Sequence, residues 1–291
     1  MFKGAFTALV TPFDDSGAID EKALRELVDR QIAGGISGLV PVGTTGESPT
    51  VTHEENIRVV EIVADQASGR VPVIAGTGSN STAEAVEMTK RAAEVGATAS
   101  LQVCPYYNKP NQEGLYRHFA AVADAADLPI VIYNIPGRTA RNIENDTILR
   151  LAEKAGVVAV KEATGSMPQV MDLIARKDTK LSVLSGDDNL TFPICALGGD
   201  GVISVASNLI PDKMSRLVSL LADGHLAEAR KLHYKLLPFF KSVFADTNPI
   251  PIKYALSVVG LIKLGYRLPL VEPSDAVKEV VRAAVASLEE V

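Results

Sequence analysis

The chain has 291 residues, of which 47% are hydrophobic and 22% carry a charged side chain. This composition is typical of a well-packed globular protein and excludes a disordered chain. The formal net charge is -6 and the sequence contains no run of lysines or arginines, so we expect no nucleic-acid partner. The length fits one large domain or two ordinary ones.

The N-terminal segment, residues 1–10, turns at Thr11-Pro12 and is too short and too polar at its flanks for a secretory signal. No apolar stretch reaches the roughly 18 residues that a membrane span needs. Cys104 and Cys195 are isolated and lack the spacing of a disulfide framework or a metal site. We therefore expect a cytoplasmic protein that does not contact a membrane.

Short apolar runs alternate with longer segments whose apolar residues recur at three-and-four spacing. Strict alternation of strand and helix implies parallel pairing through right-handed crossovers. Eight such units in about 220 residues match a closed (β/α)8 barrel better than an open doubly wound sheet. The expected strands are 5–10, 38–42, 71–75, 99–103, 129–133, 157–160, 181–184 and 201–205, and the expected helices include 21–33, 54–67, 83–93 and 143–155.

From about residue 208 onward the sequence contains no further strand pattern. We expect the eighth barrel helix there, followed by helices near 226–244, 250–264 and 274–288 that are separated by prolines. The predicted organisation is therefore a barrel over residues 1–224 and a C-terminal helical region over 225–291. This region either packs on the barrel or builds an oligomer contact, and the sequence leaves both open.

The apolar run 157–160 leads directly into Lys161, which we predict to be the last residue of a buried strand. Burial disfavours the ammonium form, lowers the pKa of the lysine and leaves some free amine at neutral pH. A free amine can attack a carbonyl carbon to form an imine. The alternative is that Lys161 extends from the strand end into solvent.

Position favours the reactive interpretation, because the active site of a parallel barrel forms at the carboxyl ends of its strands. Polar residues of this chain collect there, in the segments 43–48, 105–108, 133–134, 161–162 and 185–188. Lys180 precedes a strand instead, and we assign it no chemistry. With tyrosines, threonines and an arginine expected at the same rim, Lys161 is the predicted nucleophile.

Three residues expected near Lys161 have side chains suited to its chemistry. The Tyr133 phenol, hydrogen-bonded to the Thr44 hydroxyl, can pass protons while an imine forms and breaks. The guanidinium of Arg138, in the predicted loop 135–139, matches the shape of a carboxylate. The alternatives are a buried tyrosine with a satisfied hydroxyl and a solvated loop arginine.

Other known motifs are incomplete or missing. Gly76 and Gly78 follow a strand, but the third glycine and the acidic residue of a dinucleotide fingerprint do not follow. The sequence has no phosphate-binding loop, no His-Glu-x-x-His and no Gly-x-Ser-x-Gly. We expect no metal site, because the histidines are scattered and are predicted to lie mostly at the surface: His53, His118, His225 and His233.

Several motifs together carry a family resemblance: Gly43-Thr44-Thr45-Gly46-Glu47, then Tyr133-Asn134-Ile135-Pro136, and Lys161 within Ala159-Val160-Lys161-Glu162-Ala163, 28 residues after Tyr133. Over essentially its whole length the chain resembles the pyruvate-dependent Schiff-base aldolases and lyases. Segments 104–110, 137–139, 184–188 and 248–251 extend the match.

The resemblance implies that Lys161 forms an imine with pyruvate, whose enamine attacks L-aspartate 4-semialdehyde. Transimination by the substrate amine then closes a ring and frees the lysine, and this reaction opens the lysine and diaminopimelate branch. Thr44, Tyr133 and Tyr107 would form a proton relay, with Tyr107 supplied by a neighbouring subunit of a homotetramer, a dimer of dimers. No external cofactor is implied, since the protein amine is the electron sink.

The same resemblance implies four substrate-binding residues. Arg138 would hold the carboxylate of the semialdehyde and Thr45 would contact the carboxylate of pyruvate. The backbone around Gly186 and Ile203 would shape the pocket.

Feedback inhibition by L-lysine stays open. Five residues match positions that bind lysine in sensitive members of the family: Ser48, His53, Asn80, Glu84 and Tyr106. Pro49 and Asn56 depart from the alanine and histidine of the best-known sensitive enzymes. Glu84 can nevertheless pair with the ammonium group of a ligand.

Two other functions remain as alternatives. A sibling lyase would cleave N-acetylneuraminate or a 2-keto-3-deoxy sugar acid, but a sugar polyol does not require a carboxylate clamp such as Arg138. A barrel that senses a keto acid or an amine without turnover is the non-enzymatic alternative, and the retention of every reactive group argues against it.

Overall fold

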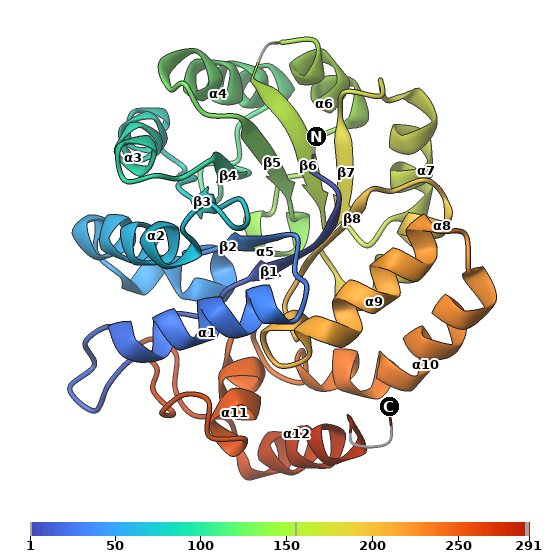
Figure 1. The fold of residues 1–291 in the computed structure, drawn as a ribbon. Coiled ribbons are helices and arrows are strands. Elements are labelled where there is room, and N and C mark those ends of the chain that lie inside the picture. Colours follow the sequence, from blue (N-terminus) through green and yellow to red (C-terminus); the bar gives the residue numbers. More distant parts are fainter. Residues whose placement is uncertain (1, 155, 289–290) are drawn as a thin grey trace.

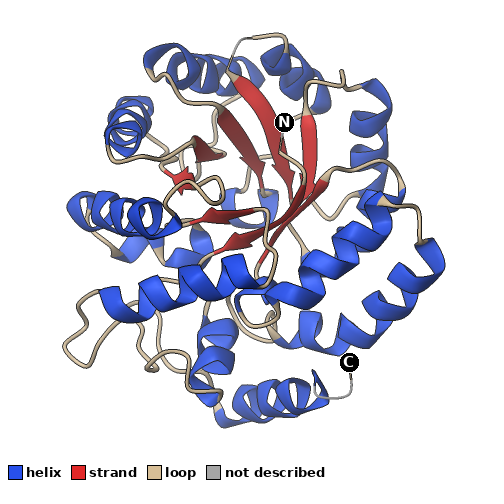
Figure 2. Ribbon diagram, in the orientation of Figure 1, coloured by secondary structure: helices blue, strands red, loops and turns tan. Residues whose placement is uncertain are grey.

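The fold is a (β/α)8 barrel, as the sequence predicts. The structure is a computed structural model that describes residues 2–154, 156–288 and 291 (Figure 1). Within these residues, eight parallel strands form one sheet in the order β2-β1-β8-β7-β6-β5-β4-β3. A parallel bridge between Leu39 and Val73 joins the two ends of this order. Figure 2 shows the strands at the centre and the helices around them.

The strands and helices lie close to their predicted positions. The strands are β1 (Gly4–Ala8), β2 (Gly38–Val40), β3 (Ile74–Gly76), β4 (Ala99–Val103), β5 (Ile130–Asn134), β6 (Val157–Glu162), β7 (Ser182–Ser185) and β8 (Gly201–Ser204). The barrel helices are α1 (Glu21–Ala33), α2 (His53–Ala67), α3 (Thr82–Glu94), α4 (Gln112–Ala125), α6 (Asn145–Ala152), α7 (Met167–Arg176), α8 (Thr191–Ala196) and α9 (Pro211–Ala222). The C-terminal helices are α10 (Leu226–Ser242), α11 (Ile250–Val258) and α12 (Asp275–Ser287).

Several boundaries differ from the sequence prediction. Strand β6 continues one residue beyond Lys161, because Glu162 still pairs with both neighbouring strands. Helix α11 ends at Val258 and not near 264, since Gly260 takes a left-handed conformation with φ 73°. Helix α6 is shorter than predicted, and residue 155 of the predicted helix 143–155 lies outside the described residues. The segment predicted as a loop around Arg138 forms a helical turn, α5 (Pro136–Thr139).

Side-chain caps fix the starts of several helices. The Asp20 carboxylate accepts a hydrogen bond from the backbone N–H of Ala23 at the start of α1. Thr52 and Glu55 form a reciprocal capping box at the start of α2. These contacts satisfy N–H groups that have no partner inside the helix.

The core has two layers. Inside the barrel, the inward side chains of alternate strand residues pack together, among them Phe6, Leu101, Val131 and Ile203. Outside it, a larger apolar cluster joins the strands to the helices and includes residues of α10 and α11 as well as α1 and α9. The C-terminal region therefore packs on the barrel, which is the first of the two alternatives above.

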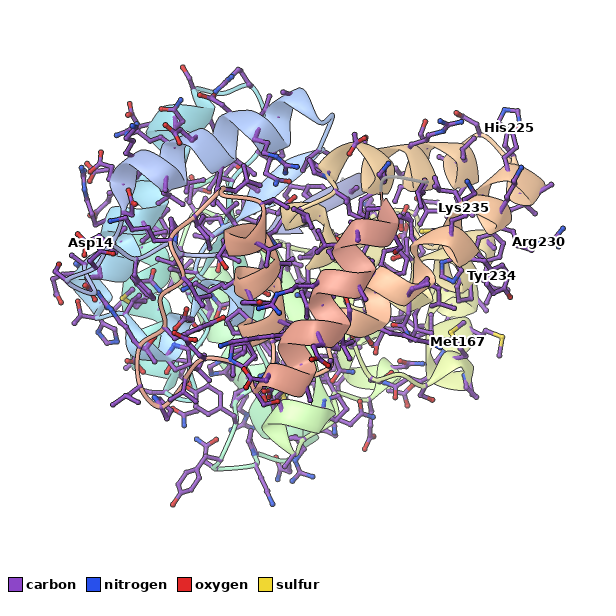
Figure 3. The ribbon with its side chains drawn as sticks, turned by 90° about the horizontal axis from the view of Figure 1, so that it is seen from below. Asp14, Met167, His225, Arg230, Tyr234 and Lys235 are labelled. Carbon is purple, nitrogen blue, oxygen red and sulfur yellow. The ribbon has the colours of Figure 1, made fainter. Side chains whose placement is uncertain are left out.

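The outer face of α10 carries polar side chains. Those of His225, Arg230 and Tyr234 project outward along it (Figure 3).

The prediction that the histidines lie mostly at the surface is wrong for two of them. His118 of α4 is buried, bonds the Thr82 hydroxyl through Nδ1 at 2.9 Å, and has a pKa lowered to about 4 by burial. His233 of α10 is buried beside Phe192 and Phe240. Both lie on the inward face of an amphipathic helix. The face on which a residue lies, and not its type, decides whether it is buried. In the described residues, no helix combines the length and the apolar composition that a membrane span requires.

Candidate active site

Lys161 and Tyr133 lie opposite each other on neighbouring strands at the carboxyl end of the barrel. They are direct partners in the register of β5 and β6. The side-chain nitrogen of Lys161 lies 4.2 Å from the centre of the Tyr133 ring, and only 5% of each residue is exposed. The side chain of Lys161 therefore does not extend into solvent, and the alternative of a solvated strand-end lysine is excluded.

Burial changes the proton affinity of Lys161. Desolvation lowers its pKa from 10.5 to about 8, and the nearby Arg138 guanidinium acts in the same direction, whereas the carboxylates of Asp187 and Asp188 partly oppose the shift. With this pKa about one molecule in ten carries the free amine at pH 7, against fewer than about one in a thousand for an ordinary lysine. Lys161 can therefore act as a nucleophile at neutral pH.

The Tyr133 phenol stays protonated over the same pH range. Burial raises the pKa of Tyr133, and Arg138 and a side-chain hydrogen bond with Thr44 only partly offset this effect. Thr44 belongs to a 3-10 turn, η1 (Thr44–Gly46), that follows β2. A neutral phenol bonded to a hydroxyl can donate and accept protons next to the amine.

Asn248 ties two predicted binding residues together from the far end of the chain. Its side-chain amide donates to the Thr45 hydroxyl at 3.0 Å, and its backbone carbonyl accepts from the Arg138 guanidinium at 3.1 Å. Thr45 and Arg138 lie on the turns after β2 and β5, so one residue fixes both. The only sequence signal for Asn248 is its place in the segment 248–251, and that signal predicts no role for it in the site.

Gly186 and the residues after it complete the surroundings of the lysine. A Cβ atom at Gly186 would lie 2.7 Å from Cβ of Ala163 and 3.3 Å from Cε of Lys161, so only glycine fits here. Asp188 is buried and accepts hydrogen bonds from the backbone N–H groups of Val205 and Ala206. Burial raises its pKa to about 6. Ile203 of β8 is fully buried inside the barrel.

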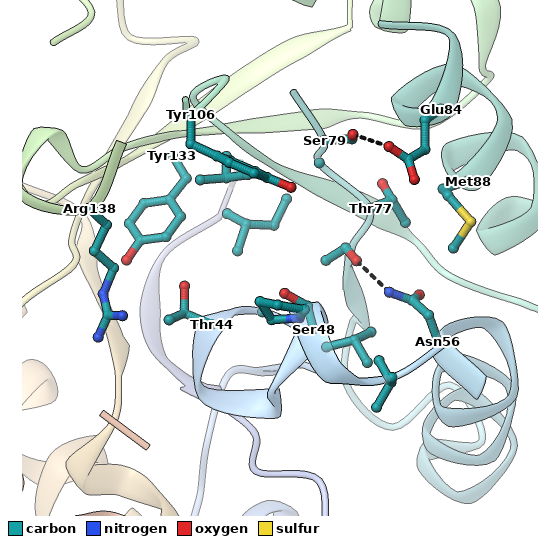
Figure 4. A pocket seen from close by; sticks show the side chains of 18 of the residues that line it. Thr44, Ser48, Asn56, Thr77, Ser79, Glu84, Met88, Tyr106, Tyr133 and Arg138 are labelled. Atoms are coloured by element: carbon teal, nitrogen blue, oxygen red, sulfur yellow. Dashed lines mark hydrogen bonds between the residues drawn. The ribbon is translucent and has the colours of Figure 1, made fainter. Parts of the chain in front are cut away.

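A cavity of about 410 Å³ opens at this rim. Thr44, Tyr133 and Arg138 line one end of it, and their polar groups point toward one another in Figure 4. Lys161 contacts the Tyr133 ring and is not one of the residues that line the cavity. In the described part of the chain, no group of three or more histidine, cysteine or acidic side chains is placed to hold a metal ion.

The model of the dihydrodipicolinate synthetase family matches residues 1–288. The chain belongs to this family. A relative from Pelobacter propionicus named 4-hydroxy-tetrahydrodipicolinate synthase is 52% identical over 287 residues, 99% of each chain.

Two solved members of the dihydrodipicolinate synthetase family have nearly the same fold. The Acinetobacter baumannii dihydrodipicolinate synthase, chloride-inhibited and in complex with pyruvate, is 42% identical with a TM-score of 0.98, and each chain is fully covered. The Cyanidioschyzon merolae enzyme with lysine bound is 40% identical with a TM-score of 0.97, covering 100% of this chain and 99% of that one.

Tyr107 is the one predicted catalytic residue of this family member that does not join the others. It has a left-handed backbone with φ 72°, and 90% of the residue is exposed. The structure brings Lys161, Tyr133 and Thr44 together without it. Its predicted role in a neighbouring subunit stays a prediction.

Four of the five positions predicted for lysine binding line the same cavity, and the fifth bonds one of them. Ser48, His53, Glu84 and Tyr106 line it, and the Asn80 amide donates to the Tyr106 carbonyl at 3.1 Å. Glu84 already bonds Nε2 of His53 at 2.6 Å and the hydroxyl of Ser79. Within the described residues, Oδ1 of Asn56 is buried without a hydrogen-bond partner. Pro49 and Asn56, the two departures from the sensitive enzymes, also line this cavity.

The lowered pKa of Lys161 predicts a pH profile. We expect kcat/KM for pyruvate to rise with pH, with a midpoint near 8, and to level off above it, because the reactive form is the deprotonated amine. In D187N the midpoint should move to lower pH, since Asp187 stabilises the ammonium form. A midpoint near that of a solvated lysine, at about 10.5, would contradict the assignment.

Proposed function

We propose that this chain is a 4-hydroxy-tetrahydrodipicolinate synthase that condenses pyruvate with L-aspartate 4-semialdehyde through a Schiff base on Lys161. The observation that carries the proposal is a dry amine with a lowered pKa, in contact with a protonated phenol at the carboxyl rim of the barrel. Membership of a family whose curated relatives have this name supports it. The reaction begins the branch that leads to diaminopimelate and lysine.

The chemistry starts when the free amine of Lys161 attacks the keto carbon of pyruvate. The resulting carbinolamine loses water to give an imine, and loss of a proton from the methyl carbon gives an enamine. The former methyl carbon then forms a bond to the aldehyde carbon of the second substrate, and the aldehyde oxygen takes up a proton. The amine of the second substrate then attacks the imine carbon, closes the ring and expels the Lys161 amine.

The surrounding residues divide this work. Tyr133 and Thr44 pass protons at the carbinolamine and imine stages, together with Tyr107 from a second subunit. Arg138 binds the carboxylate of the semialdehyde and Thr45 that of pyruvate, while the backbone at Gly186 and Ile203 shapes the pocket. The imine that the protein amine forms is itself the electron sink, so no external cofactor enters this scheme. We propose a homotetramer, a dimer of dimers, as the assembly that supplies Tyr107, and a cytoplasmic location stays a prediction from the sequence.

Steady-state assays with different aldehydes test the activity. With pyruvate held constant, we expect turnover with L-aspartate 4-semialdehyde and negligible turnover with the sugar aldehydes of the sibling lyases, because Arg138 offers a carboxylate clamp that they do not need. In R138L, KM for the semialdehyde should rise about 100-fold, the loss expected for one charge-assisted bidentate contact. Turnover of a sugar aldehyde with comparable kcat/KM would contradict the proposal.

A mixing experiment tests whether Tyr107 acts across subunits. K161A and Y107F should each be nearly inactive alone, and subunit exchange between them should restore activity. In the mixed assembly, a subunit with Lys161 can receive Tyr107 from its neighbour, which makes a complete site. If Tyr107 acts within its own chain, no mixed assembly contains a complete site, and the mixture stays inactive.

A titration tests lysine inhibition. We expect L-lysine to lower the activity, and E84Q to raise the half-inhibitory concentration about tenfold by removing the carboxylate that pairs with the ammonium group. E87Q is the matched control, because Glu87 lies on the same helix and is exposed. Activity that stays flat up to saturating L-lysine would remove this part of the proposal.

A further inference from the structure

The turn that carries Thr44 and Thr45 is bracketed by two residues in left-handed backbone conformations. Val42 has φ 48° and Glu47 has φ 56°. Neither is a glycine, and for a β-branched valine this conformation is rare. Residues in such conformations persist only where the surrounding structure holds them. The turn therefore needs anchors beyond the hydrogen bonds between its own residues.

One anchor is an ion pair with no exposed surface. The Glu47 carboxylate pairs through Oε1 with the side-chain nitrogen of Lys253, from α11, and both side chains are 0% exposed. The second carboxylate oxygen accepts from the backbone N–H of Arg267 at 3.3 Å. The Lys253 ammonium also lies 4.2 Å from the centre of the Phe13 ring. The C-terminal region thus places a positive charge directly behind the turn.

Stability alone is a weak reason for such a pair. Taking both charges out of water costs about as much as their attraction returns, and apolar pairs of similar volume are often as stable. A buried ion pair does, however, fix where its carboxylate lies, because any displacement leaves a charge without a partner. Glu47 is two residues from Thr45 and three from Thr44, so a fixed Glu47 limits where both hydroxyls can lie. Asn248, which precedes the same helix, holds Thr45 directly.

We propose that Glu47 and Lys253 are positioning residues, which hold the turn so that Thr44 meets Tyr133 and Thr45 meets pyruvate. This inference rests on the function proposed above. The C-terminal region is then part of the catalytic apparatus and not only a cap on the barrel. The pair touches no substrate and acts through the turn.

The test is the neutral double variant E47Q/K253M. Glutamine keeps an oxygen for the Arg267 N–H, methionine fills the volume of the lysine, and no charge remains unpaired. We expect kcat/KM for pyruvate to fall ten- to 100-fold, since small misplacement of reacting groups has effects on the order of 100-fold. KM for pyruvate should rise because Thr45 is displaced, and kcat should fall because Thr44 is displaced. The melting temperature should stay near that of the control variant K177M/D200N.

The control is K177M/D200N, which removes a similar pair at the other rim. Lys177 and Asp200 are 3.0 Å apart with side chains 12% and 8% exposed, and Asp200 also accepts from the backbone N–H of Val183. An asparagine keeps that acceptor. We expect this variant to keep wild-type kcat and KM whatever it does to the melting temperature, because the amino rim carries no chemistry.

Two outcomes would overturn the inference: wild-type kinetics in a folded E47Q/K253M, or losses of kcat/KM that follow melting temperature equally in both double variants. Should E47Q/K253M not fold, E47D replaces it. Aspartate accepts a left-handed backbone and keeps the charge but falls short of Lys253, so the same losses are expected. Failure of the proposed function would appear separately, as a wild-type protein that neither turns over nor forms an adduct with pyruvate.

Discussion

The contact between the amine of Lys161 and the ring of Tyr133 is the constraint on which the rest of the site depends. An amine in this position is dry, because strands β5 and β6 and the residues after β7 enclose it. Water would stabilise the ammonium form, whereas the aromatic ring and the apolar barrel interior do so less well. Asp187 and Asp188 oppose the shift only partly. The environment at the barrel rim therefore leaves Lys161 partly uncharged at neutral pH.

The remaining groups are arranged around this amine by turns and not by the strands themselves. Thr44 and Thr45 follow β2, Arg138 follows β5 and Gly186 follows β7. Turns move more easily than strands, and the turns after β2 and β5 are held by anchors from elsewhere in the chain. Asn248 and Lys253 supply anchors from the C-terminal region, across more than 200 residues of sequence. The helices beyond the eighth barrel unit thereby contribute to the geometry of the site.

The fold could be predicted from the sequence because its signals are local. Each strand is a short apolar run and each helix shows its own periodicity, so alternation alone implies parallel pairing. Lys161, Tyr133 and Thr44 could be predicted for a related reason, since the ends of parallel strands meet at one rim. The boundaries of β6 and α11 were missed because pairing across the sheet and a single glycine decide them.

The anchors could not be predicted, since nothing in the sequence near Glu47 points to Lys253 or near Thr45 to Asn248. Contacts at such separation have no periodic signature. The burial of His118 and His233 was missed for a different reason: the prediction followed residue type, whereas burial depends on which helix face packs inward. Tyr107 is a separate case. It is exposed in the single chain, and the site that it is proposed to complete belongs to a second subunit.

Borohydride reduction in the presence of pyruvate, followed by peptide mass spectrometry, tests the central claim most directly. An uncharged Lys161 amine predicts a single reduced pyruvate adduct, located on the peptide that contains Lys161 and missing in K161A. The adduct should form at neutral pH without added metal or cofactor. Absence of the adduct from wild-type protein, or its appearance mainly on other lysines such as Lys180, would contradict the account.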